Sequence, residues 1–126
     1  MRLLLDTHVV LWELRRAGAV GAEARRAITE ATEIAFSVVS FAEIGVKAAV
    51  GKLAVPDDLH EHIVGSGLRI LGLAPEHGLG VAKLPLHHRD PFDRLLISQA
   101  GEEGLTVITA DQRFADYGIS VIDAGT

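Results

Sequence analysis

Short apolar runs alternate with longer amphipathic segments along the chain, and this alternation limits the folds open to it. The apolar runs, which we interpret as buried strands, are residues 2–5, 34–38, 68–73, 106–109 and 119–122. The segments with helical spacing between them are 8–16, 22–32, 41–50, 57–64, 75–83, 91–103 and 111–117. Strands that alternate with helices predict an α/β fold, with a mostly parallel sheet covered on both faces.

The chain has 126 residues, which suits one domain with a substantial core, so we expect a single domain over 1–126. No apolar run approaches the roughly 20 residues that cross a bilayer. A secretory signal would need a longer apolar stretch than the one that Asp6 interrupts. We therefore expect a cytoplasmic protein with no membrane contact.

The sequence contains no cysteine, which excludes disulfides, thiolate zinc sites and a cysteine nucleophile. Six histidines remain as candidate ligands. The close pairs, His60 with His62 and His87 with His88, lack the i, i+4 spacing of a helical zinc site. We interpret these four as solvated surface side chains.

Four acidic residues lie just after a predicted strand or near the start of a predicted helix. Asp6 comes directly after the first strand, and Asp111 follows strand 106–109 by one residue. Glu43 lies about one turn into the helix after strand 34–38, and Asp93 lies in the first turn of helix 91–103. Ligand sites of open parallel sheets lie at the carboxyl ends of the strands, so the topology delivers three of these acids to one edge. Asp93 joins them if its helix begins at that edge.

Each of these acids also has a structural interpretation as a helix cap. Ser40 and Glu43 match the S-x-x-E capping box, and Asp6 and Asp111 could each cap the helix that follows. Asp90 precedes Pro91 at a typical cap position, and we expect Asp90 to be a cap more readily than a site residue. Periodicity alone leaves the capping and the functional interpretations about equally supported.

Clustered carboxylates suit Mg²⁺ or Mn²⁺, because these hard cations take oxygen ligands. The net charge of −5, from 12 Lys+Arg and 17 Asp+Glu, argues mildly against a passive nucleic-acid binder. It does not argue against a metallonuclease, since acids that hold divalent cations attract phosphate.

Four ordered blocks of the sequence resemble the PIN-domain family, and more narrowly the VapC-type toxins of type II toxin–antitoxin pairs. The first block is Leu4-Leu5-Asp6-Thr7-His8, and the second runs from Ser37 to Lys47 with Glu43 as its acid. The third runs from His88 to Arg94, and the fourth is Thr109-Ala110-Asp111 with Phe114. Ala42 is a departure, because many relatives carry a bulky aromatic residue before the Glu.

The resemblance implies a three-layer α/β/α PIN-like domain with Mg²⁺- or Mn²⁺-dependent endoribonuclease activity. It implies that Asp6 and Asp93 are the more direct metal ligands, and that Glu43 and Asp111 complete the catalytic quartet, in part through water. It further implies homodimerisation and inhibition by a cognate antitoxin protein.

Other residues near the acids are secondary candidates. Thr7 and Thr109 could position water or phosphate, although bonds to the local backbone are the simpler role. Arg89 and Arg94 flank the third acid and could meet RNA phosphates or an antitoxin carboxylate, with solvated surface arginines as the alternative. Trp12 is interpreted as a core or dimer contact rather than an RNA-stacking ring.

Three functions stay open at this point: an RNA-cleaving toxin, a catalytically silent PIN-like module that binds a protein, and a stand-alone RNA-processing nuclease. The intact quartet favours cleavage over the silent module. An aspartyl-phosphate enzyme would need D-x-D-x-T after the first strand, where the chain has Asp6-Thr7-His8. A dinucleotide-binding fold would need G-x-G-x-x-G there, which is missing.

Overall fold

The computed structural model describes all 126 residues of the chain. Its strands are β1 (Arg2–Leu5), β2 (Glu33–Ser37), β3 (Arg69–Leu71), β4 (Thr106–Thr109) and β5 (Val121–Asp123). They form one sheet in the order β3-β2-β1-β4-β5, and every neighbouring pair is parallel. The predicted α/β fold is confirmed, with a sheet that is entirely parallel.

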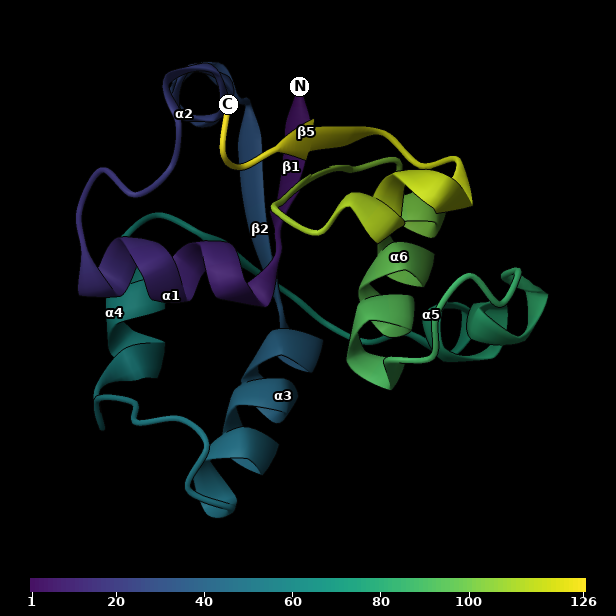
Figure 1. Cartoon of the computed structure of the whole chain (residues 1–126), viewed down its shortest axis with the longest axis horizontal. Helices are drawn as coiled ribbons and strands as arrows, with labels where there is room; N and C mark the ends of the chain where they lie inside the picture. The colour runs from purple at the N-terminus through teal and green to yellow at the C-terminus, as the bar shows by residue number, and fades with distance from the viewer.

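Helices connect the strands and cover both faces of the sheet (Figure 1). They are α1 (Thr7–Arg15), α2 (Ala22–Glu30), α3 (Val38–Ala49), α4 (Leu59–Gly65), α5 (Pro75–Gly80), α6 (Pro91–Glu103) and two 3₁₀ helices, η1 (Val81–Lys83) and η2 (Gln112–Tyr117). None of them has the length and the apolar character that a bilayer crossing requires.

The buried apolar side chains form two clusters, one on each face of the sheet. Leu3 and Leu5 of β1 pack with residues of α1, α2 and α4. Leu4, which points the other way because strand residues alternate between faces, packs with residues of α6 and η2. These two clusters and the sheet between them give the three-layer α/β/α arrangement that the sequence resemblance implies.

The expected elements are all present, and their bounds shift by a few residues. The helix expected over 41–50 begins at Val38, because Ser37 ends β2 and its hydroxyl accepts a capping bond from the Val39 amide. The helix expected over 75–83 divides into α5 and η1, and the last strand begins at Val121 rather than at residue 119. Helix α6 has the predicted bounds, 91–103.

The strand order creates a reversal of direction between β1 and β4. From β1 the chain proceeds outward to β2 and β3, and it then returns to the other side of β1 to form β4 and β5. The helices that follow β1 and β4 leave in opposite directions at this point, which opens a crevice at the carboxyl edge of the sheet. Asp6 and Asp111 lie directly beside this crevice, one after each strand.

Candidate metal centre

Asp6 occupies the cap position of α1, but its carboxylate makes no capping bond, so the capping interpretation of this residue is wrong. Its amide donates to the Ile108 carbonyl at 3.0 Å, which extends the β1–β4 pairing by one residue. Its Oδ2 accepts a hydrogen bond from the Thr109 hydroxyl at 2.7 Å. Its Oδ1 is buried and has no hydrogen-bond partner.

Glu43 lies in the second turn of α3, and it does not form the expected capping box with Ser40. The Ser40 hydroxyl instead accepts a bond from the Thr7 hydroxyl at 2.7 Å. Glu43 is only 1% exposed; its Oε2 lies 2.6 Å from the Lys47 ammonium, and its Oε1 is buried without a partner. This carboxylate is therefore half satisfied by one cation and faces the interior with its other oxygen.

Asp93 is placed by the cap of α6. The Asp90 carboxylate accepts bonds from the amides of Phe92 and Asp93, at 2.9 and 3.0 Å, as the capping interpretation of Asp90 predicts. Asp93 follows in the first turn and is 7% exposed, with its Oδ2 3.2 Å from His88 Nε2. Helix α6 thus begins at the edge of the sheet that carries the other acids.

Asp111 is a cap as well as a candidate ligand. Its carboxylate accepts from the Arg113 amide at 3.0 Å, and the Arg113 guanidinium lies 2.7 Å from Oδ2. Hydrogen bonds from this guanidinium lower the pKa of Asp111, an effect larger than the opposing effect of partial burial. Asp111 is therefore a charged carboxylate at the rim of the crevice.

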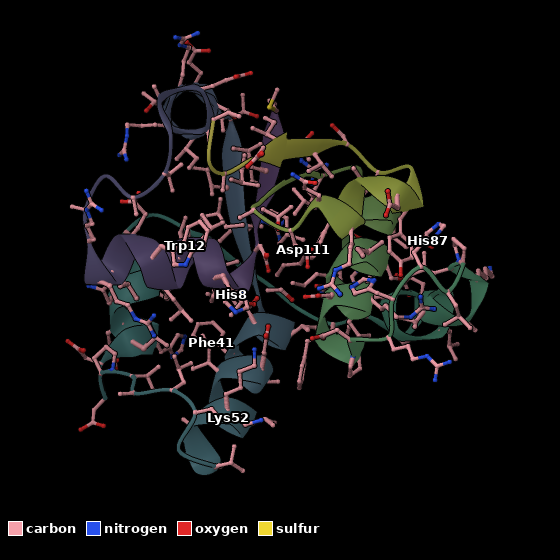
Figure 2. The ribbon with its side chains drawn as sticks, viewed as in Figure 1. His8, Trp12, Phe41, Lys52, His87 and Asp111 are labelled. Atoms are coloured by element: carbon pink, nitrogen blue, oxygen red, sulfur yellow. The ribbon has the colours of Figure 1, made fainter.

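Three of the four acids line a single pocket of about 290 Å³, here called the acidic pocket, whose lining includes Asp6, Asp90, Asp93, Asp111, His8 and Trp12. Glu43 belongs to the lining of a neighbouring groove, here called the α1–α3 groove, whose lining includes His8, Trp12, Arg15, Glu43, Lys47 and Lys52. His8 and Trp12 line both spaces, so the two lie side by side. Figure 2 labels His8 on α1 and Asp111 in the segment after β4, which approach the same edge from different elements.

The acids do not form a finished coordination shell. No three acidic or histidine side chains are close enough together to hold a metal ion as they stand. Asp111 is turned toward Arg113, and Glu43 is bound to Lys47. The structure therefore gathers the carboxylates around one crevice, and rotations of these side chains would be needed to bring their oxygens onto one cation.

The carboxylates nevertheless affect one another's ionisation. Burial, followed by repulsion from Asp90, Asp6, Glu43 and Asp111, raises the pKa of Asp93 to about 7. Burial also raises the pKa of Asp6, and this effect exceeds the opposing effect of its bond from Thr109. The ionised forms of Asp6 and Asp93 are thus destabilised in the metal-free protein, and a bound divalent cation would stabilise them.

The raised pKa of Asp93 predicts how the stability of the metal-free protein depends on pH. Between the ordinary pKa of 3.8 and about 7, the unfolded chain has released this proton while the folded chain retains it. The contribution of Asp93 to the free energy of unfolding therefore falls as the pH rises through that window, and above the window it is constant. We expect urea unfolding to show a steeper loss of free energy over this window for the wild type than for Asp93→Asn. Equal pH dependence in the two proteins would contradict the assignment.

Sequence reasoning missed a hydrogen-bonded chain behind Asp93. His88, predicted to be a solvated surface residue, is 8% exposed, so that prediction is wrong; His60, His62 and His87 are exposed as expected. Its Nδ1 lies 2.8 Å from the Tyr117 hydroxyl, while its Nε2 faces Asp93. A consistent assignment has the Tyr117 hydroxyl donating to Nδ1 and Nε2–H donating to Asp93. The only available sequence signal was that His88 begins the block containing Asp93.

Arg94 is a structural residue, and both roles proposed for it from the sequence are wrong. It is 7% exposed, and its guanidinium donates to the carbonyl oxygens of Val81, Leu84, Pro85 and His88 and to the Tyr117 hydroxyl. It cannot reach RNA phosphate or an antitoxin carboxylate from this position. Its hydrogen bonds hold the segment between η1 and α6 in contact with η2.

The remaining secondary candidates have distinct surroundings. Thr109 bonds a catalytic candidate directly, because its hydroxyl donates to Asp6 and accepts from the Asp111 amide at 3.0 Å. Thr7 bonds Ser40 rather than the local backbone. Arg89 is exposed and makes no hydrogen bond. Trp12 is half-buried against the first apolar cluster, and its indole also lines the acidic pocket.

The residues present suit a hard divalent cation. The donor set consists of carboxylate oxygens, the ligand type that Mg²⁺ and Mn²⁺ prefer. Asp6 Oδ1 and Glu43 Oε1 are the only buried side-chain polar atoms in the structure without a hydrogen-bond partner. Buried polar atoms are almost always satisfied, so two orphaned carboxylate oxygens beside one crevice indicate a missing positive partner.

Comparisons with known proteins agree with the fold. The family model described as the PIN domain matches residues 3–119. The chain is 28% identical over 123 residues to Ribonuclease VapC22 of Mycobacterium tuberculosis, and the match covers 91% of each chain.

Solved structures with the same fold include the DNA-bound VapBC from Salmonella typhimurium, with a TM-score of 0.72, 19% identity and 98% of each chain covered. Another is VapBC2 from Rickettsia felis bound to a promoter DNA fragment, with a TM-score of 0.74, 18% identity, and 97% of this chain and 98% of that chain covered. At these identities the structures show the fold alone. Since the family model spans almost the whole sequence, the chain belongs to the PIN domain family, as its resemblance to VapC-type proteins implied.

Proposed function

We propose that this protein is a Mg²⁺- or Mn²⁺-dependent endoribonuclease that acts as the toxin of a toxin–antitoxin pair. The observation that carries the proposal is a pair of buried, unpartnered oxygens, Asp6 Oδ1 and Glu43 Oε1. Asp6 lines the acidic pocket with Asp93 and Asp111, and Glu43 is near enough to raise the pKa of both Asp6 and Asp93. The similar protein from Mycobacterium tuberculosis is named a ribonuclease, which supports the same reaction class.

In this proposal Asp6 and Asp93 hold the cation most directly, and Glu43 and Asp111 complete the site. When bound, the cation supplies Lewis-acid chemistry for hydrolysis of a phosphodiester bond by water. The Thr109 hydroxyl fixes the Asp6 carboxylate, and the His88 imidazole fixes that of Asp93. Bonds of this kind hold a ligand's oxygens in place and typically change metal affinity 10–100-fold when lost.

Lys47 and Arg113 have a second use at the same site. In the structure they pair with Glu43 and Asp111. If those carboxylates turn toward a cation, the ammonium and the guanidinium are released beside the pocket, where they can bind the phosphate of the substrate.

A cognate antitoxin and a homodimer are also proposed for this chain. The antitoxin is supported by the likeness to solved VapBC structures and to one described as a toxin–antitoxin complex from Klebsiella pneumoniae, and the homodimer is what the family resemblance implies. An RNA-cleaving toxin would act in the cytoplasm, where its substrate is. A neighbouring gene for a small DNA-binding protein would separate the toxin from a stand-alone RNA-processing enzyme.

Metal dependence is tested by binding as well as by activity. We expect Mn²⁺ at about 100 times its dissociation constant to stabilise the folded protein by roughly 2.7 kcal/mol, which corresponds to a rise in Tm of roughly 10 °C. The single tryptophan, Trp12, lines the pocket, so Mn²⁺ should also quench its fluorescence. A chelator should reverse both effects and abolish RNA cleavage. A catalytically silent module would show no cleavage under any metal, and an unchanged Tm would contradict the metal site itself.

A further inference from the structure

The α1–α3 groove is a partly polar space of about 330 Å³ that lies next to the acidic pocket and shares His8 and Trp12 with it. Its walls are one side of α1, with His8, Trp12 and Arg15, and the facing side of α3, with Glu43 and Lys47. Lys52, just beyond α3, also lines it. In Figure 2, Trp12 and His8 are labelled on α1 and Lys52 beside the lower part of α3.

The charge of this groove is opposite to that of the whole molecule. The chain carries a net charge of −5, yet three cations and one acid line the groove. Lys47 and Glu43 neutralise each other. Arg15 and Lys52 are exposed and take part in none of the ion pairs of the structure. A protein that is acidic overall needs a local positive track to bring a polyanion to its catalytic acids.

These cations are positioned to contact a nucleic-acid strand whose cleaved bond lies in the acidic pocket. Arg15 lies seven residues beyond His8 on the same helix, which is about 10 Å along its axis. A cation at that distance would contact phosphates next to the cleaved bond rather than the reacting phosphate. Single-stranded nucleic acids are bound in this way, by a positive groove that follows the backbone beside an aromatic ring, and Trp12 lines both the groove and the pocket.

We infer that the α1–α3 groove binds the sugar–phosphate backbone of single-stranded RNA beside the cleaved bond, with Arg15 and Lys52 contacting its phosphates. This inference rests on the proposed nuclease function, because it assigns a place to the substrate of that enzyme. It assigns a role to Arg15 and Lys52, which belong neither to the proposed metal site nor to any ion pair of the structure.

The test compares two charge-matched double variants in an Asp6→Asn background, in which the probe is not cleaved. The groove variant is Arg15→Gln with Lys52→Gln. The control is Arg16→Gln with Lys83→Gln, which removes two exposed cations that line neither the groove nor the pocket and make no ion pair. Binding of a fluorescein-labelled oligouridylate is followed by anisotropy over a range of salt concentrations.

Each phosphate contact contributes about 0.7 to the slope of log affinity against log salt for a single strand, so the groove variant should lose about 1.4 of that slope. Its affinity should fall roughly 10- to 30-fold near 0.1 M salt, and the control should retain both the slope and the affinity. In the parent with Asp6 intact, the same groove changes should raise KM for RNA more than they lower kcat.

Equal losses in the groove variant and the control would overturn the inference, since the effect would then come from net charge alone. Unchanged RNA binding combined with a lost affinity for an acidic peptide would also overturn it, and would assign the groove to a protein partner. RNA cleavage by the wild-type protein with Mn²⁺ is measured separately. If the groove variant loses RNA binding but the wild type cleaves no RNA, the nuclease proposal is contradicted. If the wild type cleaves RNA but the groove variant binds RNA normally, this inference is contradicted.

Discussion

Asp6→Asn is expected to reduce RNA cleavage by more than about 100-fold and to stabilise the metal-free protein. The first effect follows because even residues that only orient a ligand change metal binding 10–100-fold, and Asp6 is assigned here as a ligand. The second follows because burial raises the pKa of Asp6 and its Oδ1 has no partner, so a neutral amide removes an unfavourable buried charge. Substitutions that relieve such strained sites contribute about 0.5–2 kcal/mol.

Thermal unfolding with and without Mn²⁺ measures the stabilisation and the loss of metal binding, and an RNA cleavage assay measures the loss of activity. The variant should have a higher Tm than the wild type without metal, and the rise in Tm with Mn²⁺ should be absent. Asp116→Asn is the matched control, because Asp116 is an exposed acid of η2 whose side chain makes no hydrogen bond. A variant that still cleaves RNA, or a control that loses activity equally, would remove Asp6 from the site.

Arg94→Met is expected to destabilise the protein by about 3 kcal/mol, while Arg89→Met should leave its stability nearly unchanged. Arg94 donates to four backbone carbonyls and to Tyr117, and its loss removes a charged donor from acceptors that are at least partly buried. A loss of this size corresponds to a fall in Tm of roughly 10 °C. Because the same segment carries His88, affinity for Mn²⁺ should fall as well.

Arg89 provides a close comparison for that experiment. It lies five residues before Arg94, bears the same charge, is exposed and makes no hydrogen bond. Thermal unfolding of the two variants followed by circular dichroism, with a Mn²⁺ titration of each, separates the loss of the Arg94 hydrogen bonds from the loss of a surface positive charge. Comparable melting temperatures for Arg94→Met and the wild type would contradict the role assigned to Arg94.

The sequence was sufficient for features that depend on neighbouring residues. The alternation of strands and helices predicted the parallel sheet, and the Asp90-Pro91 pair predicted both the cap and the start of α6. The position of acids after strands also follows from the topology, since parallel strands deliver their carboxyl ends to one edge. The burial of Asp6, Glu43 and Asp93 at that edge is a property of the folded chain that the pattern did not reveal.

Features that depend on contacts between distant segments were not predictable. Arg89 and Arg94 were equivalent in the sequence, and only the path of residues 81–90 over η2 separates them. His88 is buried because it meets Tyr117, which lies 29 residues away along the chain. The Ser40-Glu43 pattern was misleading for a local reason: Val38 and Val39 already belong to the helix, so Ser37, three residues earlier, is the cap.

The proposed metal site requires carboxylates from four separate segments to share one divalent cation. Anomalous diffraction at the manganese absorption edge, from crystals grown with Mn²⁺, locates that cation. We expect a peak in the acidic pocket, with oxygens of Asp6 and Asp93 at about 2 Å and with Glu43 and Asp111 turned toward it. A crystal saturated with Mn²⁺ that shows no peak there, or a peak only at other surface acids, would contradict it.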